Sequence, residues 1–294
     1  MSKKSLIVGM GIGNLYQAEL EKLGYQTVTV DANPAKQANF TCIADAKSVH
    51  GTFETAHICT PNSTHYELAQ QAGLCADIVF IEKPGVKNSL EFKMLDHTST
   101  RYMMVKNNQW RDNIVELQDL AHKSREVRLN WINNDRVPNP GTWFTTKHQA
   151  FGGVSRDLMP HLLSLYTAFN SNYHTTQPSK FETKTNWQLS DLTRSDYGTV
   201  NAQGTYDVDD YCSLVFENTK LWKLTADWRS LKGDQRNIEF VMQDGSVETF
   251  ELGLCPEQAY QNMIADAVKN IDNDAYWHVQ LANDIWIHNI LEKL

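Results

Sequence analysis

Cysteine is scarce in this sequence, and the few cysteines are not paired. The five occur at positions 42, 59, 75, 212 and 255, and none forms a Cys-x-x-Cys pair. Disulfide frameworks and structural zinc sites both need paired, regularly spaced cysteines. We therefore expect reduced thiols and no metal site.

Long apolar runs are also absent. The apolar residues near the N-terminus stop at glycines within the first 13 residues, far short of the roughly 20 that a membrane-spanning helix needs. The same stretch is too short for the core of a signal peptide. We expect a soluble protein that stays in the cytoplasm and has no membrane partner.

An excess of basic residues is lacking as well. Lys and Arg number 27 against 35 Asp and Glu, which gives a net charge of −8 at pH 7. The basic residues are scattered, whereas a nucleic-acid partner requires a basic face against the phosphate backbone. Nucleic acid is therefore not expected as a partner. The 294 residues, with 41% hydrophobic content, suffice for two ordinary globular domains.

Short apolar runs alternate with segments of helical spacing over the first 110 residues. Strands are predicted at residues 6–8, 27–30, 56–59, 78–81 and 102–105, with helices at 14–23, 64–72 and 89–97 between them. Such alternation is typical of α/β proteins with a doubly wound parallel sheet, the Rossmann architecture. We expect a Rossmann domain at residues 1–110.

The rhythm changes after residue 107. Helices are predicted at residues 113–123, 153–169, 256–270 and 279–293, and strands at 127–132, 211–216, 221–228 and 238–242. An Asp-Gly turn after the last of these strands indicates a hairpin. The pattern predicts an α+β domain with a largely antiparallel open sheet at residues 111–294.

A glycine-rich turn stands directly after the first predicted strand. Glycines at such a place allow a tight turn and let a pyrophosphate approach the N–H groups at a helix N-terminus. The match to Gly-x-Gly-x-x-Gly is imperfect because Asn14 takes the third glycine's place, so an ordinary glycine-rich turn stays open as an alternative. The turn comprises Gly9, Met10, Gly11, Ile12, Gly13 and Asn14.

Asp31 ends the second predicted strand, twenty residues after Gly11. A carboxylate there can accept hydrogen bonds from the adenine ribose hydroxyls and would repel a 2′-phosphate. The alternative is a turn aspartate ahead of Pro34. Together, the glycine-rich turn and Asp31 predict NAD as the cofactor, with NADP still possible.

Three further stretches resemble the motifs of one enzyme family. They are Thr60-Pro61-Asn62 with His65, Glu82-Lys83-Pro84, and Gly152-Gly153 with Asp157 and His161. In this order they resemble the TPNxxH, EKP and GGxxxDxGxH motifs of the Gfo/Idh/MocA oxidoreductases, relatives of glucose–fructose oxidoreductase and inositol dehydrogenase. The resemblance covers the first domain and runs to about residue 166, with weaker likeness over residues 206–211.

The resemblance implies an NAD(H)-dependent oxidoreductase. Its hydride would move between nicotinamide and a hydroxyl or carbonyl carbon of a sugar, cyclitol or sugar derivative. The catalytic residues implied are Lys83, Asp157 and His161. His161 would take or give the proton, and Lys83 would polarise the substrate oxygen. Asp157 would orient His161 or hydrogen-bond the substrate. The second domain would bind the substrate and join subunits into a homodimer or homotetramer.

Residue chemistry agrees with this assignment. Lys83 follows a parallel strand at the edge where such sheets bind ligands, and Asp157 and His161 have the spacing of one helix face. A solvated loop lysine and a His–Asp pair on a helix surface are the alternatives. The cofactor residues implied beyond the glycine-rich turn and Asp31 are Thr60, Pro61, Asn62, His65, Glu82 and Lys83.

Asn108 and Trp143 are weaker candidates for contact with the substrate, and Asn107, Trp110 and Arg111 are further possible pocket residues. A tryptophan can stack on a sugar face, but it is equally suited to a core. Other functions on the same fold also stay open. They are an imine or pigment-type reductase, a dinucleotide-binding sugar sensor without turnover, and a redox-neutral enzyme that recycles bound NAD.

Overall fold

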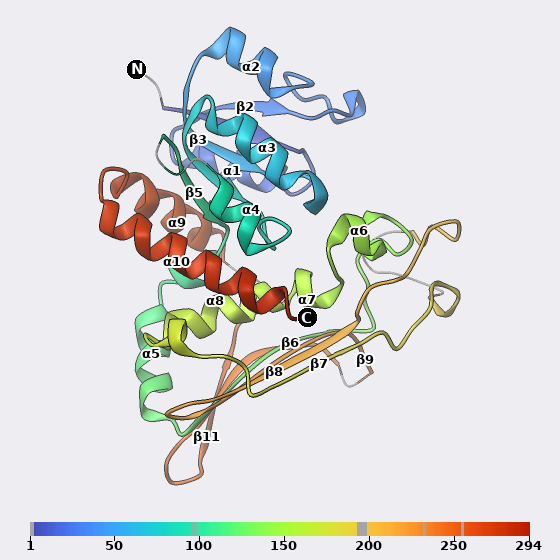
Figure 1. The fold of residues 1–294 in the computed structure, drawn as a ribbon, viewed down its shortest axis with the longest axis vertical. Coiled ribbons are helices and arrows are strands. Elements are labelled where there is room, and N and C mark those ends of the chain that lie inside the picture. Colours follow the sequence, from blue (N-terminus) through green and yellow to red (C-terminus); the bar gives the residue numbers. More distant parts are fainter. Residues whose placement is uncertain (1–2, 96, 98, 193–198, 232, 254–255) are drawn as a thin grey trace. The chain divides into compact units, whose positions relative to one another are not determined.

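The computed structural model describes residues 3–95, 97, 99–192, 199–231, 233–253 and 256–294. The chain forms two compact units (Figure 1). The first comprises Met1–Asn107 and Pro256–His288, and the second comprises Asn108–Cys255 and Asn289–Leu294.

A five-stranded parallel sheet forms the centre of the first unit, as predicted. Its spatial order is β2-β1-β3-β4-β5. Because β2 and β3 lie on opposite sides of β1, the loops after β1 and β3 meet at a switch point, where doubly wound sheets bind ligands. The strands are β1 (Lys4–Val8), β2 (Gln26–Val30), β3 (Phe53–Ile58), β4 (Ala76–Ile81) and β5 (Arg101–Met104).

Helices cover both faces of this sheet. Tyr16 of α1 contacts the ring of His57 on one face, whereas Ile43 of α2 and Ala69 of α3 join Leu6 in the apolar core on the other. Burial of both faces explains the continuous apolar character of the strands. The helices are α1 (Gly13–Lys22), α2 (Ile43–His50), α3 (His65–Gly73), α4 (Ser89–Met94), α9 (Glu257–Lys269) and α10 (Asp274–Leu291).

The two C-terminal helices differ from the predicted division into domains, because α9 and most of α10 belong to the first unit. Leu281 and Ile285 of α10 pack against the apolar core of the parallel sheet. Asp284 accepts a hydrogen bond from Met104 N at 3.0 Å and forms an ion pair with Lys106. Apolar spacing predicts a helix but not the sheet on which it packs, so the sequence alone assigned this segment to the second domain.

A six-stranded mixed sheet forms the second unit, in the order β11-β10-β6-β9-β8-β7. Neighbouring strands are antiparallel except for the central pair β6 and β9. The predicted largely antiparallel sheet is confirmed. The strands are β6 (Glu126–Asn134), β7 (Lys180–Lys184), β8 (Tyr211–Glu217), β9 (Leu221–Ser230), β10 (Gln235–Val241) and β11 (Val247–Glu251).

One face of the mixed sheet is buried by helices. Tyr166 of α8 stacks on Phe216 with ring centroids 4.3 Å apart and meets Trp222 edge-on at 5.1 Å. Alternate residues on the opposite face are half-buried, which is the period-2 pattern of an antiparallel sheet with one covered face. The helices of this unit are α5 (Ile114–Lys123), α6 (Lys147–Ala150), α7 (Val154–Asp157) and α8 (Met159–Phe169).

Three elements, α2, α6 and β7, were not predicted from the sequence, and β11 was indicated only as the second strand of the predicted hairpin. In α2 only Ile43 and Ala46 are buried, which is too little for a clear helical pattern. Strands β7 and β11 lie at the two edges of the mixed sheet, and most of their side chains are exposed. They therefore lack the apolar alternation by which strands are predicted.

The described cysteines Cys42, Cys59, Cys75 and Cys212 are free thiols, and Cys255 lies outside the described residues. Within the same described ranges, no group of three or more His, Cys, Asp or Glu side chains is placed to hold a metal ion. None of the helices in the described part of the chain combines the length and the apolar character needed to cross a bilayer.

His57 lies within β3 between aromatic rings. It is 1% exposed, stacks on Phe80 of β4 with centroids 4.9 Å apart, and lies 4.9 Å from the ring of Tyr16. Neither ring nitrogen has a hydrogen-bond partner among the described residues. Burial lowers the pKa of His57 to about 3, because an imidazolium here would lose its hydration without compensation.

We expect His57 to make the first unit less stable in mild acid. The ordinary pKa of 6.5 applies in the unfolded chain, so below it the unfolded state binds a proton that the folded state does not. The free energy of unfolding therefore falls as the pH falls, by about 2 kcal/mol between roughly pH 7.5 and pH 5. Urea unfolding at both pH values measures this loss.

The matched variant is His57→Phe, which keeps a ring between Tyr16 and Phe80 but cannot titrate. It should lose about 2 kcal/mol less than the wild type over the same pH interval. Equal losses in the two proteins would contradict the prediction.

Candidate active site

The turn after β1 is held by neighbours on both sides. Gly9 N donates a hydrogen bond to Val30 O of β2 at 2.8 Å. A Cβ at Gly9 would lie 2.7 Å from Cys59 O in the loop after β3, and the φ of Gly9 is +95°. Both facts require glycine. The close approach fixes the turn at the switch point of the sheet.

Gly11 and Gly13 have different surroundings. Apart from Gly11 and its two chain neighbours, no described residue has an atom within 4 Å of a Cβ built on Gly11, so the space beside it is open. A Cβ on Gly13 would lie 2.9 Å from Ile7 Cγ2, so this glycine lets α1 approach β1 closely. Close packing is the role of the third glycine in the regular motif. Asn14 can therefore occupy that position, where its Nδ2 donates to Met10 O at 3.0 Å.

Asp31 braces the glycine-rich turn from the end of β2. One carboxylate oxygen accepts a hydrogen bond from Met10 N at 2.8 Å and the other from Asn33 N at 2.8 Å. The side chain thus has the local turn contact that the sequence left as an alternative. Each carboxylate oxygen can accept more than one hydrogen bond, so contact with a ribose stays a prediction.

His65 joins the loops after β3 and β4. Its buried ring places Nδ1 2.6 Å from Gly85 O and Nε2 2.8 Å from Thr60 O. Burial lowers the pKa of His65, and a neutral ring donates to one of these two carbonyls. The ring therefore holds the Thr60-Pro61-Asn62 segment against the Glu82-Lys83-Pro84 segment. Direct contact of His65 with a cofactor stays a prediction.

Glu82 and Lys83 have different environments although they are neighbours. Glu82 is 8% exposed; its Oε1 accepts a hydrogen bond from Tyr16 OH at 2.7 Å and its Oε2 accepts one from Lys83 N at 3.1 Å. Burial, together with the Glu82 charge, raises the pKa of Tyr16. Lys83 is partly exposed and precedes a cis peptide bond to Pro84. Glu82 thus anchors the loop, and Lys83 keeps contact with solvent.

The second unit carries Asp157 and His161 around a break between two helices. The predicted single helix over residues 153–169 consists of α7 and α8, with Leu158 between them and Pro160 in the first turn of α8. Proline has no N–H to continue the preceding helix and suits the start of a new one. Asp157 therefore ends one helix and His161 lies in the next. Between residues 152 and 167 these two residues alone stay partly exposed.

Two tryptophans of the mixed sheet hold these side chains. Trp228 of β9 donates from Nε1 to Asp157 Oδ2 at 3.0 Å. The ring of His161 stacks on Trp131 of β6, with centroids 4.7 Å apart and planes at 17°. Neither tryptophan was predicted, because each is distant in sequence from the residue it holds. The alternation of buried residues along β6 and β9 is the signal that places both on the helix-covered face.

Asn108 links His161 to Arg111. Arg111 Nε donates to Asn108 Oδ1 at 2.9 Å, and Asn108 Nδ2 lies 3.4 Å from His161 Nδ1. Asn108 is fully buried. Trp143, the other substrate candidate, is half-buried and stacks on Phe144 with centroids 4.0 Å apart. Substrate contact stays a prediction for both Asn108 and Trp143.

Consecutive aspartates before β8 hold two different segments. Asp209 accepts hydrogen bonds from Gly153 N at 2.9 Å and from Ser155 N at 2.7 Å. It therefore caps α7, the helix that ends at Asp157. Asp210 accepts a hydrogen bond from Trp187 N at 3.1 Å. Residues 206–211, whose likeness to the family motifs is weaker, thus position the segment that carries Asp157.

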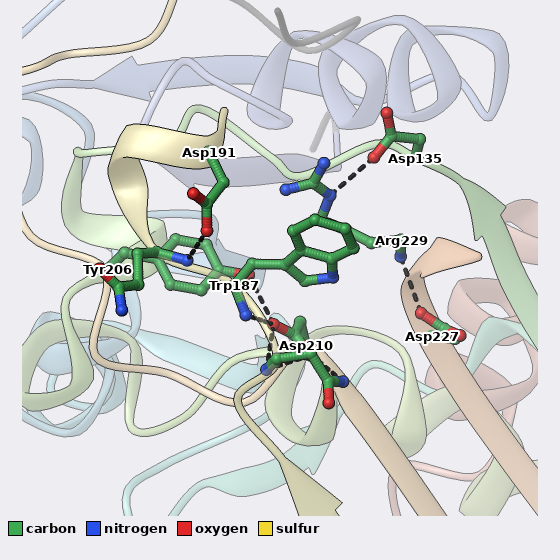
Figure 2. Close-up of polar contacts among 9 residues, drawn as sticks. Asp135, Trp187, Asp191, Tyr206, Asp210, Asp227 and Arg229 are labelled. Atoms are coloured by element: carbon green, nitrogen blue, oxygen red, sulfur yellow. Dashed lines mark hydrogen bonds and ion pairs between the residues drawn. The ribbon is translucent and has the colours of Figure 1, made fainter. Parts of the chain in front are cut away.

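Figure 2 shows the network around Asp210, which directly precedes β8, and Arg229, which lies near the end of β9. Arg229 Nε donates to Asp135 Oδ1 at 2.6 Å, and its guanidinium lies 3.9 Å from the ring centre of Trp187. Tyr206 OH donates to Asp210 Oδ2 at 3.3 Å, and burial raises the pKa of both Tyr206 and Asp210. Stacking and charge together attach the residues around Trp187 to the sheet.

Comparison with known proteins relates the chain to oxidoreductases. No protein-family model matches it. It is 30% identical over 181 residues to a UDP-kanosamine synthase oxidoreductase subunit of Amycolatopsis mediterranei, an overlap of 55% of this chain and 50% of that protein. The match therefore spans about half of this relative's length.

The architecture defines a two-unit α/β protein with a Rossmann sheet and a mixed sheet. More particularly, it is the fold of several solved proteins, dehydrogenases among them. GenD2 from gentamicin A biosynthesis, solved with NAD, has a TM-score of 0.74 at 18% identity over 99% of this chain and 92% of that chain. Levoglucosan dehydrogenase, solved with NADH and levoglucosan, has a TM-score of 0.72 at 16% identity over 100% of this chain and 98% of that chain. A myo-inositol dehydrogenase from Corynebacterium glutamicum has a TM-score of 0.70 at 13% identity over 99% of this chain and 96% of that chain.

We expect Asp209→Ala to destabilise the second unit, because it removes the acceptor for the N–H groups of Gly153 and Ser155. Hydrogen bonds to a charged group contribute about 1.5–3 kcal/mol each and do not add fully, so a loss of about 2–4 kcal/mol is expected. Urea unfolding measures it.

Asp244→Ala is the control, because Asp244 accepts a hydrogen bond from Ser246 N at 2.9 Å in an exposed hairpin. We expect this variant to lose clearly less stability than Asp209→Ala, because Asp244 is exposed to solvent. Similar losses in the two variants would show that Asp209 contributes no more than an exposed turn residue.

Proposed function

We propose that this chain is a Gfo/Idh/MocA oxidoreductase that uses NAD(H) to move a hydride to or from a hydroxyl or carbonyl carbon of a sugar, cyclitol or sugar derivative. The observation that carries the proposal is the switch point of the parallel sheet. There Gly11 leaves open space beside the start of α1, and the carboxylate of Asp31 contacts the same turn. The ordered motifs and the shared fold support it.

A dinucleotide fits the residues at this edge of the first unit. The start of α1 offers backbone N–H groups and a partial positive charge to a pyrophosphate. Asp31 suits the ribose hydroxyls and disfavours a 2′-phosphate, so we propose NAD rather than NADP. His65 and Glu82 hold the loops after β3 and β4 in place. The loop residues proposed to contact the cofactor are Thr60, Pro61, Asn62 and Lys83.

Lys83, Asp157 and His161 are proposed as the catalytic set. Bound nicotinamide would supply the carbon that gives or takes the hydride. Lys83 and His161 then act on the reacting oxygen, and Asp157 orients the substrate. Partial exposure of Asp157 and His161 within an otherwise buried segment supports a role outside the core of their own unit.

The substrate that we propose is a small polyhydroxylated molecule. The similar proteins are named after levoglucosan, myo-inositol and UDP-kanosamine. We also propose a cytoplasmic homodimer or homotetramer, joined through the half-buried face of the mixed sheet. A screen of polyols, aldoses and nucleotide sugars for NADH absorbance tests the activity, and bound dinucleotide without turnover of any of them would favour a sensor.

We expect NADH to bind more tightly than NADPH. Two like charges about 4 Å apart repel by about 1 kcal/mol or more, which predicts a preference of at least about fivefold. Asp31→Ala should reduce this preference. Fluorescence titration with both reduced cofactors measures it, and equal or tighter NADPH binding by the wild type would contradict the role of Asp31.

The control for this titration is Gly11→Val. The open space at Gly11 lets the protein fold with the larger side chain, but the side chain occupies the place proposed for the pyrophosphate. A folded variant should therefore lose both cofactors. Native affinity in that variant would remove the glycine-rich turn from the site.

We expect Lys83→Ala and His161→Ala to keep near-native affinity for NADH, because the cofactor contact proposed for Lys83 is one of several, and to lose turnover by about 10²–10⁴-fold each. The double variant should lose less than the product, because the two groups act on one oxygen. Lys87→Ala, an exposed lysine in the same loop, is the matched control and should keep native turnover. Native kcat in either catalytic variant would remove that residue from the set.

A further inference from the structure

The side-chain amide of Asn108 has one permitted orientation. Arg111 Nε carries a hydrogen at every accessible pH and can only donate, and it lies 2.9 Å from Asn108 Oδ1. Exchanging the oxygen and nitrogen of Asn108 would set its NH₂ group against that N–H. Asn108 is fully buried, where two facing donors are costly. Nδ2 is therefore the atom that faces His161.

This orientation determines which nitrogen of His161 carries the hydrogen. Asn108 Nδ2 lies 3.4 Å from His161 Nδ1. An amide nitrogen can only donate, so Nδ1 accepts, and the one hydrogen of a neutral ring is on Nε2. At this distance the hydrogen bond is weak, but its direction is fixed by Arg111. Stacking on Trp131 holds the plane of the ring.

Three charged side chains of the surrounding elements have contacts within this unit. Arg111 is bonded to Asn108, and Asp157 accepts the Trp228 Nε1 hydrogen bond at 3.0 Å. Arg236 of β10 lies 5.5 Å from the ring centre of Trp131. Helix α8 itself contains no Asp, Glu, Lys or Arg. The group that faces His161 Nδ1 is the amide donor of Asn108. A carboxylate in the same place would instead favour a hydrogen on Nδ1.

We propose that Asn108, oriented by Arg111, fixes neutral His161 as the tautomer with its hydrogen on Nε2, so that His161 donates a hydrogen bond to the substrate oxygen and does not accept its proton. This rests on the proposed function and makes Asn108 a positioning residue. It differs from the expectation that His161 is the general base. A neutral imidazole N–H can still stabilise the negative charge that develops on the oxygen.

The proton then goes to another group. In the oxidative direction the substrate carbon would lose a hydride to bound oxidised nicotinamide, and the O–H bond of the substrate would break. The proton passes to the neutral amine of Lys83, which becomes an ammonium group. The new carbonyl oxygen keeps the hydrogen bond from His161 Nε2. Reduction runs the same steps in reverse.

Nitrogen-15 NMR of the protein alone tests the tautomer without turnover. The chain has 10 histidines, and the ring signals of His161 are those that disappear in His161→Gln. We expect a protonated Nε2 and an unprotonated Nδ1 at about pH 8. A hydrogen on Nδ1 at that pH would overturn the proposal, and this measurement decides even if a substituted protein fails to fold.

Asn108→Asp reverses the polarity at Nδ1. The carboxylate can still accept from Arg111 and offers its other oxygen to His161. The hydrogen should therefore move to Nδ1, and the titration midpoint of the ring should rise by about one pH unit or more. Asn113→Asp makes the same chemical change at the start of α5 and should leave the His161 signals as in the wild type. An unchanged tautomer in Asn108→Asp would show that the amide does not set it.

Turnover provides a second test. His161→Gln keeps an N–H donor, whereas His161→Ala keeps none, so the glutamine variant should be about tenfold faster than the alanine variant. Both should keep the rise of the oxidative rate with pH that is expected when Lys83 must lose its proton to act as the base. Equal rates in the two variants, with loss of that rise, would identify His161 as the base. Absence of NAD-linked turnover in the wild type would refute the proposed function, while the NMR result still decides the tautomer.

Discussion

Parallel pairing of β1 with both β2 and β3 is the constraint on which the candidate site depends. Parallel strands end at one edge of a sheet, so the glycine-rich turn, Asp31 and the loop after β3 all emerge at the same place. The close approach of Gly9 to Cys59 O is possible for this reason. An antiparallel β2 or β3 would carry Asp31 or Thr60 to the opposite edge.

The loop after β4 is held at this edge from both sides. His65 contacts Gly85 O on one side, and Val86 N donates to His288 Nε2 of α10 at 3.1 Å on the other. The Nδ1 of His288 lies 2.6 Å from Asp284 O. Asp284 itself is paired with Lys106 after β5. The C-terminal helix thus fixes the loop that carries Lys83, although about 200 residues separate them in sequence. The catalytic role proposed for Lys83 needs such support, because catalytic groups act through fixed geometry.

Sequence reasoning predicted the parts of the fold that have a local signal. The alternation of strands and helices predicted the parallel sheet, and short apolar segments in the second half of the chain predicted β6, β8 and β9. It failed for α2, for the short helix α6 and for the edge strand β7, and it indicated the edge strand β11 only through the hairpin turn before it. It also placed α9 and α10 in the second unit, because an amphipathic helix has no local feature that identifies its sheet. The parallel pairing of β6 with β9 likewise depends on a long connection that strand patterns do not specify.

The candidate site divides in the same way. The motifs predicted Lys83, Asp157 and His161 as residue types at suitable positions, but not the residues that determine what each can do. Trp228 and Trp131 come from separate strands of the mixed sheet and reach Asp157 and His161 through tertiary packing. Gly13 was noted in the sequence, but only the structure shows that it packs closely against Ile7. This close packing explains how the turn tolerates Asn14 in place of the third glycine.

Histidine is the residue for which this distinction has the greatest chemical consequence. A motif can supply the ring, but the partner of the far nitrogen determines whether the near nitrogen accepts or donates a hydrogen. A carboxylate at Nδ1 favours a base at Nε2, whereas an amide donor at Nδ1 places the hydrogen on Nε2. In this chain the partner is Asn108, and its direction is set by Arg111. Arginine suits that task because it stays protonated at any accessible pH. Two residues outside the three family motifs thus determine the chemistry available to the histidine within one.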